Sequence, residues 1–238
     1  MFRVLFYIYM KGVIFAAGKG TRFLPLTNTI PKALILVDEK PVIFYALDAL
    51  EPFVDEFIIV VGHLSELVIS SLGNTYKNKP ITYVTQRDMK GTAGALWSIK
   101  DLLHGQRFII AHCDDVIFQS DIQKMISHDY TIGIYPLHRS FTLPKTFSIN
   151  HSQEGVFTGL SRPDPEDTVI NTATGVYVLD DTFFQEDPIK LSNGEYGLPQ
   201  TLVEFAKKNT VHTILFSQWL PVNSPEEQIR AESILKAG

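Results

Sequence analysis

The sequence predicts an α/β fold with helices packed on a predominantly parallel, mixed central sheet. Two patterns predict this fold. In the first half of the chain, short apolar runs alternate with segments of helical periodicity, which is the rhythm of βαβ units. From residue 131 onward the segments become shorter and β-like, and stretches rich in Pro and Asp separate them. No internal repeat or low-complexity linker divides the chain, so we expect one domain over residues 1–238.

The individual elements follow from hydrophobic periodicity and from helix-start signals. Short apolar runs predict buried strands. Pro41 suits the first turn of a helix, and apolar residues follow it at helical spacing. The expected helices are 41–50, 65–72, 92–103 and a last one that begins near Ser224. The expected strands are 13–17, 57–61, 81–85, 108–111, 131–135, 146–149, 156–160, 175–179 and 211–216.

Composition and charge exclude several classes of function. A hydrophobic content of 45% and a charged content of 20% are typical of globular proteins. The net charge of −5, with no basic cluster, argues against a nucleic-acid partner. The single cysteine, Cys113, excludes an internal disulfide and fits a reducing compartment.

The first nine residues read as an upstream extension. The apolar stretch 5–10 is too short to cross a membrane, which takes about 20 apolar residues. No small-residue cleavage site follows it, so a secretory signal is not indicated. We therefore expect Met10 to be the natural start, and a cytoplasmic protein with no membrane partner.

The strongest functional signal follows the first predicted strand, in the segment VIFAAGKGTRFLPLTNTIPK. Gly18 and Gly20 allow a tight turn that brings backbone N–H groups close to a ligand. Arg22 and Lys32 add two cations to the same loop. Amides and cations together predict a polyphosphate site, and we expect a nucleoside triphosphate there.

Two common phosphate-binding motifs are excluded. The P-loop pattern G-x-x-x-x-G-K-[ST] does not occur in the chain. The dinucleotide pattern G-x-G-x-x-G needs a small residue where Phe23 stands, although Asp38 lies at a suitable distance for a ribose ligand. Pro25 and Pro31 also prevent the uninterrupted helix that this motif opens.

The string FAAGKGTRFLPLTNTIPKAL resembles the signature of the sugar-phosphate nucleotidyltransferases, or NDP-sugar pyrophosphorylases. The resemblance implies a three-layer Rossmann-like, GT-A-like fold. It also implies a Mg²⁺-dependent transfer from a nucleoside triphosphate to a sugar 1-phosphate, with Arg22 and Lys32 as catalytic residues. Residues 10–130 would form the nucleotide-binding half and residues 131–238 the acceptor-binding half. The resemblance places these residues at the nucleotide: Ala16, Ala17, Gly18, Gly20 and Thr21.

A second motif, TQRDMKGTAGAL, indicates how the base is chosen. Gln86 offers a donor and an acceptor that can hydrogen-bond the edge of a pyrimidine. Gly91 allows the base to approach the backbone, and Thr92 follows it. Uridylyl- and thymidylyltransferases of the family carry a similar string, which favours UTP or dTTP. The alternative interpretation is a plain strand-to-helix turn with a Thr cap.

A third motif places carboxylates after an apolar strand, in FIIAHCDD. Carboxylates at the carboxyl edge of such a sheet suit Mg²⁺, and the resemblance implies Asp114 as the metal ligand. Asp115 takes that role if the register shifts by one. Cys113 stands where relatives have Gly, which narrows the space beside the ion. We expect His112 and Cys113 to be buried structural residues and not a metal pair.

The second half matches the family less closely. Relatives often have Glu-Lys-Pro where this chain has Ser161-Arg162-Pro163, and Arg162 keeps the positive charge for the acceptor phosphate. Asn171 and Gly175 match the turn and strand that face the sugar in relatives. The alternative for both is an ordinary turn and strand start.

A second metal ligand has two candidates. Asn223, in WLPVNSPEE, matches a stretch in which some relatives hold Mg²⁺ through Asn, and we select it. Gln200 stands where Asp is often found, and we leave it out of the site. The alternative role for Asn223 is the start of the last helix.

Three other functions stay open. Cytidylyltransferases of similar length act on phosphocholine, which an aromatic cage would recognise. A non-catalytic nucleotide-sugar-binding module is a second alternative, given the departures at Cys113, Ser161 and Gln200. A metal-dependent glycosyltransferase is a third, although adjacent Asp114 and Asp115 are not its Asp-x-Asp pattern. Whether the chain forms a homo-oligomer is also open.

Overall fold

The computed structural model describes residues 10–86, 90–138 and 147–237. A single eight-stranded sheet takes strands from both halves of the chain, in the order β13-β9-β12-β7-β1-β4-β6-β5. The expectation that the natural chain starts at Met10 depends on residues 1–9, which lie outside the described residues. The strands of this sheet are β1 (Met10–Ala16), β4 (Glu56–Val61), β5 (Thr75–Tyr76), β6 (Lys79–Thr85), β7 (Arg107–His112), β9 (Thr131–His138), β12 (Val169–Asp180) and β13 (His212–Leu215).

The sheet is parallel at its centre and mixed at one side. Strands β7, β1, β4 and β6 run parallel to one another. Strand β12 pairs antiparallel with both β7 and β9, and the short edge strand β5 pairs antiparallel with β6. The predicted mixed, mainly parallel sheet is therefore confirmed. Because the central strands are parallel, their carboxyl ends meet at one edge, and ligands bind at that edge in open α/β sheets.

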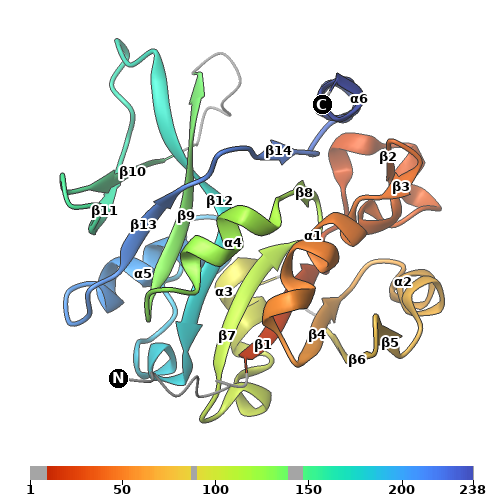
Figure 1. Ribbon diagram of the computed structural model, residues 1–238, viewed down its shortest axis with the longest axis horizontal. Helices are drawn as coiled ribbons and strands as arrows, with labels where there is room; N and C mark the ends of the chain where they lie inside the picture. Colours follow the sequence, from red (N-terminus) through yellow and green to blue (C-terminus); the bar gives the residue numbers. More distant parts are fainter. Residues whose placement is uncertain (1–9, 87–89, 139–146, 238) are drawn as a thin grey trace, which may run out of the picture.

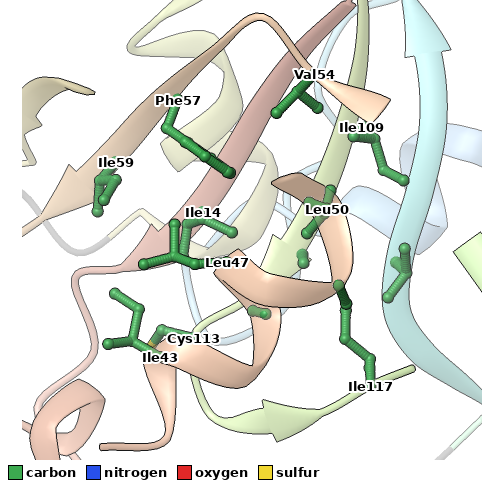
Figure 2. Close-up of a cluster of buried hydrophobic side chains, with 14 of the residues drawn as sticks. Ile14, Ile43, Leu47, Leu50, Val54, Phe57, Ile59, Ile109, Cys113 and Ile117 are labelled. Carbon is green, nitrogen blue, oxygen red and sulfur yellow. The ribbon is translucent and has the colours of Figure 1, made fainter. Parts of the chain in front are cut away.

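Helices cover both faces of the sheet and give three layers. Figure 1 shows α1 (Ile43–Leu50) and α4 (Gln119–Met125) on the near face, with α3 (Gly91–Trp97) on the far face. On the near face, α1 packs Ile43, Leu47 and Leu50 against the sheet, as Figure 2 shows. On the far face, α3 and α5 (Leu198–Phe205) bury a second apolar cluster. Burying both faces explains the continuous apolar runs inside the central strands, at residues 13–16 of β1, 57–61 of β4 and 108–111 of β7.

A third, smaller cluster fixes the loop that follows β1. It joins Phe23 of that loop to Leu220 and Val222, which lie just before α6 (Pro225–Ala237). Short antiparallel pairs brace this corner: β2 (Leu36–Val37) with β3 (Lys40–Pro41), and β8 (Asp115–Val116) with β14 (Leu220–Pro221). The end of the chain is thereby held beside the Gly-rich loop.

The remaining elements lie at the periphery. Helix α2 (Ser65–Leu72) follows β4, and the hairpin of β10 (Ser148–His151) and β11 (Phe157–Ser161) lies beside β12. None of the helices in the described residues is both long and apolar enough to cross a membrane.

Several predicted elements differ from the structure in their bounds. Pro41 lies in β3, so α1 begins at Ile43 and not at the proline. The helix predicted over 92–103 ends at Trp97 because the Ile99 N–H bonds to the Leu96 carbonyl, a tighter turn that leads into a 3-10 segment. The strand predicted from Gly175 begins six residues earlier, at Val169. The strand predicted over 146–149 begins at Ser148 in the described residues, and Thr146 lies outside them.

Candidate functional site

The main cleft lies at the carboxyl edge of the parallel strands and has a volume of about 520 Å³. Its walls come from the Gly-rich loop after β1, the ends of β6 and β7, the start of α3 and the segment before α5. Eleven of the residues that the sequence predicted for the site line it: Ala17, Gly18, Gly20, Thr21, Arg22, Lys32, Gln86, Gly91, Thr92, Asp114 and Asn223. The sequence motifs therefore converge on one cleft.

The Gly-rich loop folds back on itself. Gly20 has a φ of +64°, and a Cβ there would lie 2.9 Å from the Thr27 side chain and 3.0 Å from that of Lys32. The Gly20 carbonyl accepts hydrogen bonds from the Phe23 N–H and the Thr27 hydroxyl, both at 2.9 Å. Only glycine suits this conformation and this space. Ala16, predicted to bind the nucleotide, is instead buried in the apolar core, and its neighbour Ala17 lines the cleft.

Two cations meet two oxygen ligands at one corner of the cleft. The Lys32 ammonium forms an ion pair with the Asp114 carboxylate and donates a hydrogen bond of 2.9 Å to Asn223 Oδ1. The Arg22 guanidinium donates to the same Asn223 oxygen at 3.0 Å. The Asn223 N–H donates to the Glu227 carboxylate at 2.7 Å, which fixes the backbone at this point. We call these four residues, Arg22, Lys32, Asp114 and Asn223, the cation corner.

Asp114 and Asp115 are adjacent, but burial and nearby charges shift their pKa values in opposite directions. Burial disfavours the charged form of Asp114, but the ion pair with Lys32 outweighs burial and lowers the pKa of Asp114. Asp115 is buried, and burial together with the Asp114 charge raises its pKa well above the usual value. Asp114 is therefore the aspartate whose charged form is favoured at this corner, and Asp115 is the one whose neutral form is favoured.

The cysteine beside them belongs to the core. Cys113 is 6% exposed, packs in the apolar cluster with Ile43 of α1, and presents a small part of its surface to the cleft. Figure 2 shows the two side chains next to each other. Burial raises the pKa of the Cys113 thiol well above its usual value. The expected structural role of Cys113 agrees with this placement.

The opposite end of the cleft is polar and tightly built. Gln86 follows β6, and its side-chain Nε2 is buried with no hydrogen-bond partner among the described residues. Gly91 has a φ of +73°, and a Cβ there would lie 2.6 Å from the Tyr196 carbonyl oxygen. The Thr92 hydroxyl accepts a hydrogen bond of 3.0 Å from the Leu198 N–H. The start of α3 is thus pinned against the segment that leads into α5.

A side pocket of about 280 Å³ adjoins the main cleft. The two spaces share the residues Thr92, His112, Asp114, Pro199 and Asn223. The side pocket adds Asp115, Ala173, Thr174, Gly175, Tyr177 and Trp219. Because Asp114 and Asn223 line both spaces, a ligand in the side pocket would meet one in the main cleft at the cation corner.

Only one of the three predicted acceptor residues lies at this side pocket. Gly175 lines it, but Arg162 is exposed and lines neither space. Asn171 also lines neither space, and its side-chain amide lies 3.3 Å from the His151 ring nitrogen. It stands inside β12 and not in a turn, because the strand is longer than its apolar pattern indicates.

Two residues that the sequence reasoning set aside belong to the site. His112 lines both spaces, and its side chain is 31% exposed, so it is not the buried structural residue that we expected. Gln200 lines the main cleft. The position of His112 could have indicated that it belongs to the site. It is the last residue of β7, and the ends of central strands present side chains to a ligand.

The residues at the end of β7 could hold a metal ion. Ligand atoms of His112, Asp114 and Asp115 all lie within 4.8 Å of one another. The Asp114 and Asn223 oxygens both bond to one ammonium group, so they converge on the position of a single cation. Oxygen ligands of this kind suit Mg²⁺.

Comparison with known proteins agrees with this geometry. A family model described as nucleotidyl transferase matches residues 11–132. The chain is 27% identical over 241 residues to a UTP–glucose-1-phosphate uridylyltransferase of Haloferax volcanii, with 95% of this chain and 97% of that protein covered. It is 26% identical over 233 residues to the bifunctional protein GlmU of Methanocaldococcus jannaschii. That alignment covers 95% of this chain and 54% of the relative, so the chain spans about half the length of GlmU.

Solved structures agree in fold. A UDP-glucose pyrophosphorylase in complex with UDP-glucose superposes with a TM-score of 0.80 at 24% identity, covering 96% of this chain and 99% of that one. A UTP-bound UGPase from Acinetobacter baumannii gives a TM-score of 0.75 at 19% identity, covering 95% and 93%. At these identities the likeness establishes the three-layer fold.

Proposed function

The chain belongs to the nucleotidyl transferase family, and on that premise we propose that it transfers a nucleotidyl group from a nucleoside triphosphate to a sugar 1-phosphate. The products are a nucleoside-diphosphate sugar and pyrophosphate. One observation carries this proposal: the cation corner lies where the main cleft meets the side pocket. Two negatively charged substrates, one in each space, would bring their phosphates together beside Arg22 and Lys32.

The reaction needs alignment and charge neutralisation, and no protein nucleophile. An oxygen of the sugar phosphate attacks the α-phosphorus and forms the new P–O bond. The bond from the α-phosphorus to the bridging oxygen breaks, and pyrophosphate leaves with the electron pair. Arg22 would hold the leaving phosphates, and Lys32 would stabilise charge on the α-phosphate oxygens.

A divalent cation fits the oxygen ligands of this corner. Asp114 and Asn223 would hold it, because their side-chain oxygens already converge on one cationic group. When bound, Mg²⁺ would neutralise phosphate charge and order the triphosphate. Lys32 must then exchange its contact with Asp114 for the substrate phosphates.

The base end of the cleft favours a pyrimidine, and we propose UTP or dTTP as the donor. The buried, unpartnered Gln86 amide is the supporting observation, since buried polar atoms are nearly always hydrogen-bonded. A uracil or thymine edge offers a carbonyl acceptor to this donor. Gly91 lines the same cleft, and its missing side chain lets the start of α3 pack directly against Tyr196.

A sugar phosphate fits the side pocket better than phosphocholine. Thr174 Oγ1 and His112 Nε2 are buried there without partners among the described residues. A quaternary ammonium group has no donor or acceptor to satisfy them, whereas sugar hydroxyls have both. We therefore propose a sugar 1-phosphate, and not phosphocholine, as the acceptor.

The test is pyrophosphate release in the presence of Mg²⁺. Purified protein is incubated with UTP, dTTP, CTP, GTP or ATP and a pool of sugar 1-phosphates, with phosphocholine assayed separately. Release that needs both UTP or dTTP and a sugar 1-phosphate is the expected result. Release that needs CTP and phosphocholine would show that the acceptor is phosphocholine and not a sugar 1-phosphate. Binding of UTP by calorimetry without release would indicate a nucleotide-sugar-binding module.

A further inference from the structure

The side pocket contains a histidine whose position suggests a role in choosing the acceptor. His112 is the last residue of β7 and lines both the side pocket and the main cleft. It therefore stands next to the cation corner, where the phosphates of the two substrates are proposed to meet. The inference that follows rests on the proposed function and concerns the sugar half of the acceptor.

Three neighbours fix the imidazole ring. The ring centroid lies 6.0 Å from that of Phe15, and Nδ1 lies 3.9 Å from the Asp115 carboxylate. On the side of β12 the ring meets bare backbone: a Cβ at Gly175 would lie 2.7 Å from Nδ1. Gly175 also has a φ of +76°, which favours glycine. The missing side chain at Gly175 thus makes room for the His112 ring.

The other ring nitrogen has no partner. Nε2 of His112 is buried, and no hydrogen-bond partner for it exists among the described residues. Thr174 Oγ1, which belongs to another residue of the same pocket, is also buried and unpartnered. Leaving such groups unsatisfied costs about 1–3 kcal/mol each, so they mark a place that a polar ligand completes. Nε2 is therefore an unpartnered nitrogen on a ring that packs against Phe15 and Gly175, and it is available to a polar ligand.

We propose that His112 is a specificity-determining residue, whose Nε2 hydrogen-bonds the acceptor hydroxyl nearest to the phosphate, on the carbon next to the phosphate-bearing one. Its place at the boundary of the two spaces determines which hydroxyl this is. The phosphate occupies the cation corner, so the first ring substituent beyond it reaches the end of β7. The substrate class is then a sugar 1-phosphate with a free 2-hydroxyl.

The experiment compares a matched pair of acceptors. After the pool assay has identified the best sugar 1-phosphate, kcat/KM is measured for it and for its 2-deoxy counterpart. The wild-type protein is expected to prefer the hydroxylated acceptor by about 10- to 100-fold, which is the range for one lost hydrogen bond to a buried group. His112→Phe keeps a ring against Gly175 but removes the nitrogen, and the preference should fall to within about threefold.

Two further variants separate recognition from structure. His112→Gln places an amide near the position of Nε2 and should restore part of the preference. His104→Phe changes an exposed histidine that is paired with Asp181 at 3.2 Å and lines neither space, and it should keep the full preference. Circular dichroism and the Tm should match wild type in all three variants, which a general distortion of the fold would alter.

The outcomes distinguish this inference from the proposed function. If the wild-type protein makes no product with any sugar 1-phosphate, the proposed function fails. If it turns over both acceptors equally well, the inference fails while the proposed function stands. A wild-type-like preference in His112→Phe would also overturn the inference. If His112→Phe does not fold, the preference of the wild-type protein between the two acceptors still tests the inference. His112→Gln then takes the place of His112→Phe in the comparison.

Discussion

The Lys32 ammonium is hydrogen-bonded at 2.9 Å to the side-chain oxygen of Asn223, which lies 191 positions further along the chain. The same ammonium is paired with the Asp114 carboxylate. In the free protein, Lys32 therefore occupies the position between the two oxygens proposed to hold the metal. Lysine and metal compete for one place, and the consequence can be measured.

Replacing Lys32 with methionine should change turnover and metal affinity in opposite directions. Turnover should fall by about 10²–10³-fold, because a charge that stabilises the transition state is lost. Binding of Mn²⁺ without nucleotide should become roughly tenfold tighter, because the competing charge between Asp114 and Asn223 is gone. Electron paramagnetic resonance of free Mn²⁺ measures the affinity.

The matched control for this prediction is Lys100→Met, which changes an exposed lysine in the 3-10 segment after α3. It should leave both quantities unchanged. Mn²⁺ affinity that is equal or weaker in Lys32→Met would show that the lysine and the metal do not share a position. Unchanged turnover would remove Lys32 from the mechanism.

Substituting Gly91 with alanine should damage the nucleotide end of the cleft. The added Cβ would lie 2.6 Å from the Tyr196 carbonyl, in a residue with a φ of +73°. That carbonyl also accepts the Ala93 N–H at 3.0 Å, so the start of α3 would be pushed away from the segment before α5. We expect a loss of stability of about 1–3 kcal/mol and a raised KM for the triphosphate.

Thermal unfolding and steady-state kinetics measure these two effects. Gly105→Ala is the control for backbone conformation, since Gly105 has a φ of +68° but open space around its Cβ position. Gly105→Ala should lower the stability of the protein without raising the KM for the nucleoside triphosphate. An unchanged KM in Gly91→Ala would mean that the nucleotide does not use this end of the cleft.

The stability of the protein should depend on Asp48 in a defined pH range. Burial disfavours the Asp48 charge, but hydrogen bonds from Lys40, Lys77 and Tyr76 prevail and lower its pKa to about 2. A carboxyl whose pKa is lower in the folded state stabilises the fold above its unfolded pKa. That stabilisation is lost as the pH falls from about 4 to about 2. Asp48→Asn should therefore lower the Tm at pH 7, and the difference from wild type should shrink at acid pH.

Unfolding in buffers from pH 7 down to the acid limit of the native state checks this prediction. Glu66→Gln, an exposed acid in the first turn of α2, is the control. A difference between Asp48→Asn and wild type that stays constant with pH would contradict it.

The single cysteine offers a reporter of the cleft. Cys113 is 6% exposed, and burial raises its pKa, so the reactive thiolate is scarce in the folded protein. Labelling with a thiol reagent at pH 8 should be about 100-fold slower than in urea. UTP should slow it further, because Cys113 also lines the main cleft. Labelling at the unfolded rate in buffer would contradict the burial of this residue.

The sequence predicted most of the Gly-rich-loop residues that line the main cleft, because this motif is local. Gly18, Gly20 and Arg22 stand within one loop, and their spacing alone brings them together. The central strands contain continuous apolar runs, so their positions were also predictable. The order of strands and the return of β12 beside β7 depend on pairings between distant residues, which periodicity does not encode.

The acceptor end was harder to predict for the same reason. Arg162 carries the charge that the family pattern asks for, but the hairpin of β10 and β11 places it outside both spaces. His112 was taken for a structural residue because an apolar run precedes it. The room for its ring beside the side pocket comes from Gly175, which reaches this position only when β12 pairs with β7. A contact of that kind is decided by tertiary structure.

The pairing of β14 with β8 determines when the site can come into existence. Arg22 and Lys32 are made early, but the oxygen that accepts a hydrogen bond from both of them belongs to Asn223, just after β14. A chain still growing on the ribosome has the Gly-rich loop and the whole parallel sheet before it has that oxygen. The cation corner therefore stays incomplete until residue 223 has emerged and β14 has paired with β8.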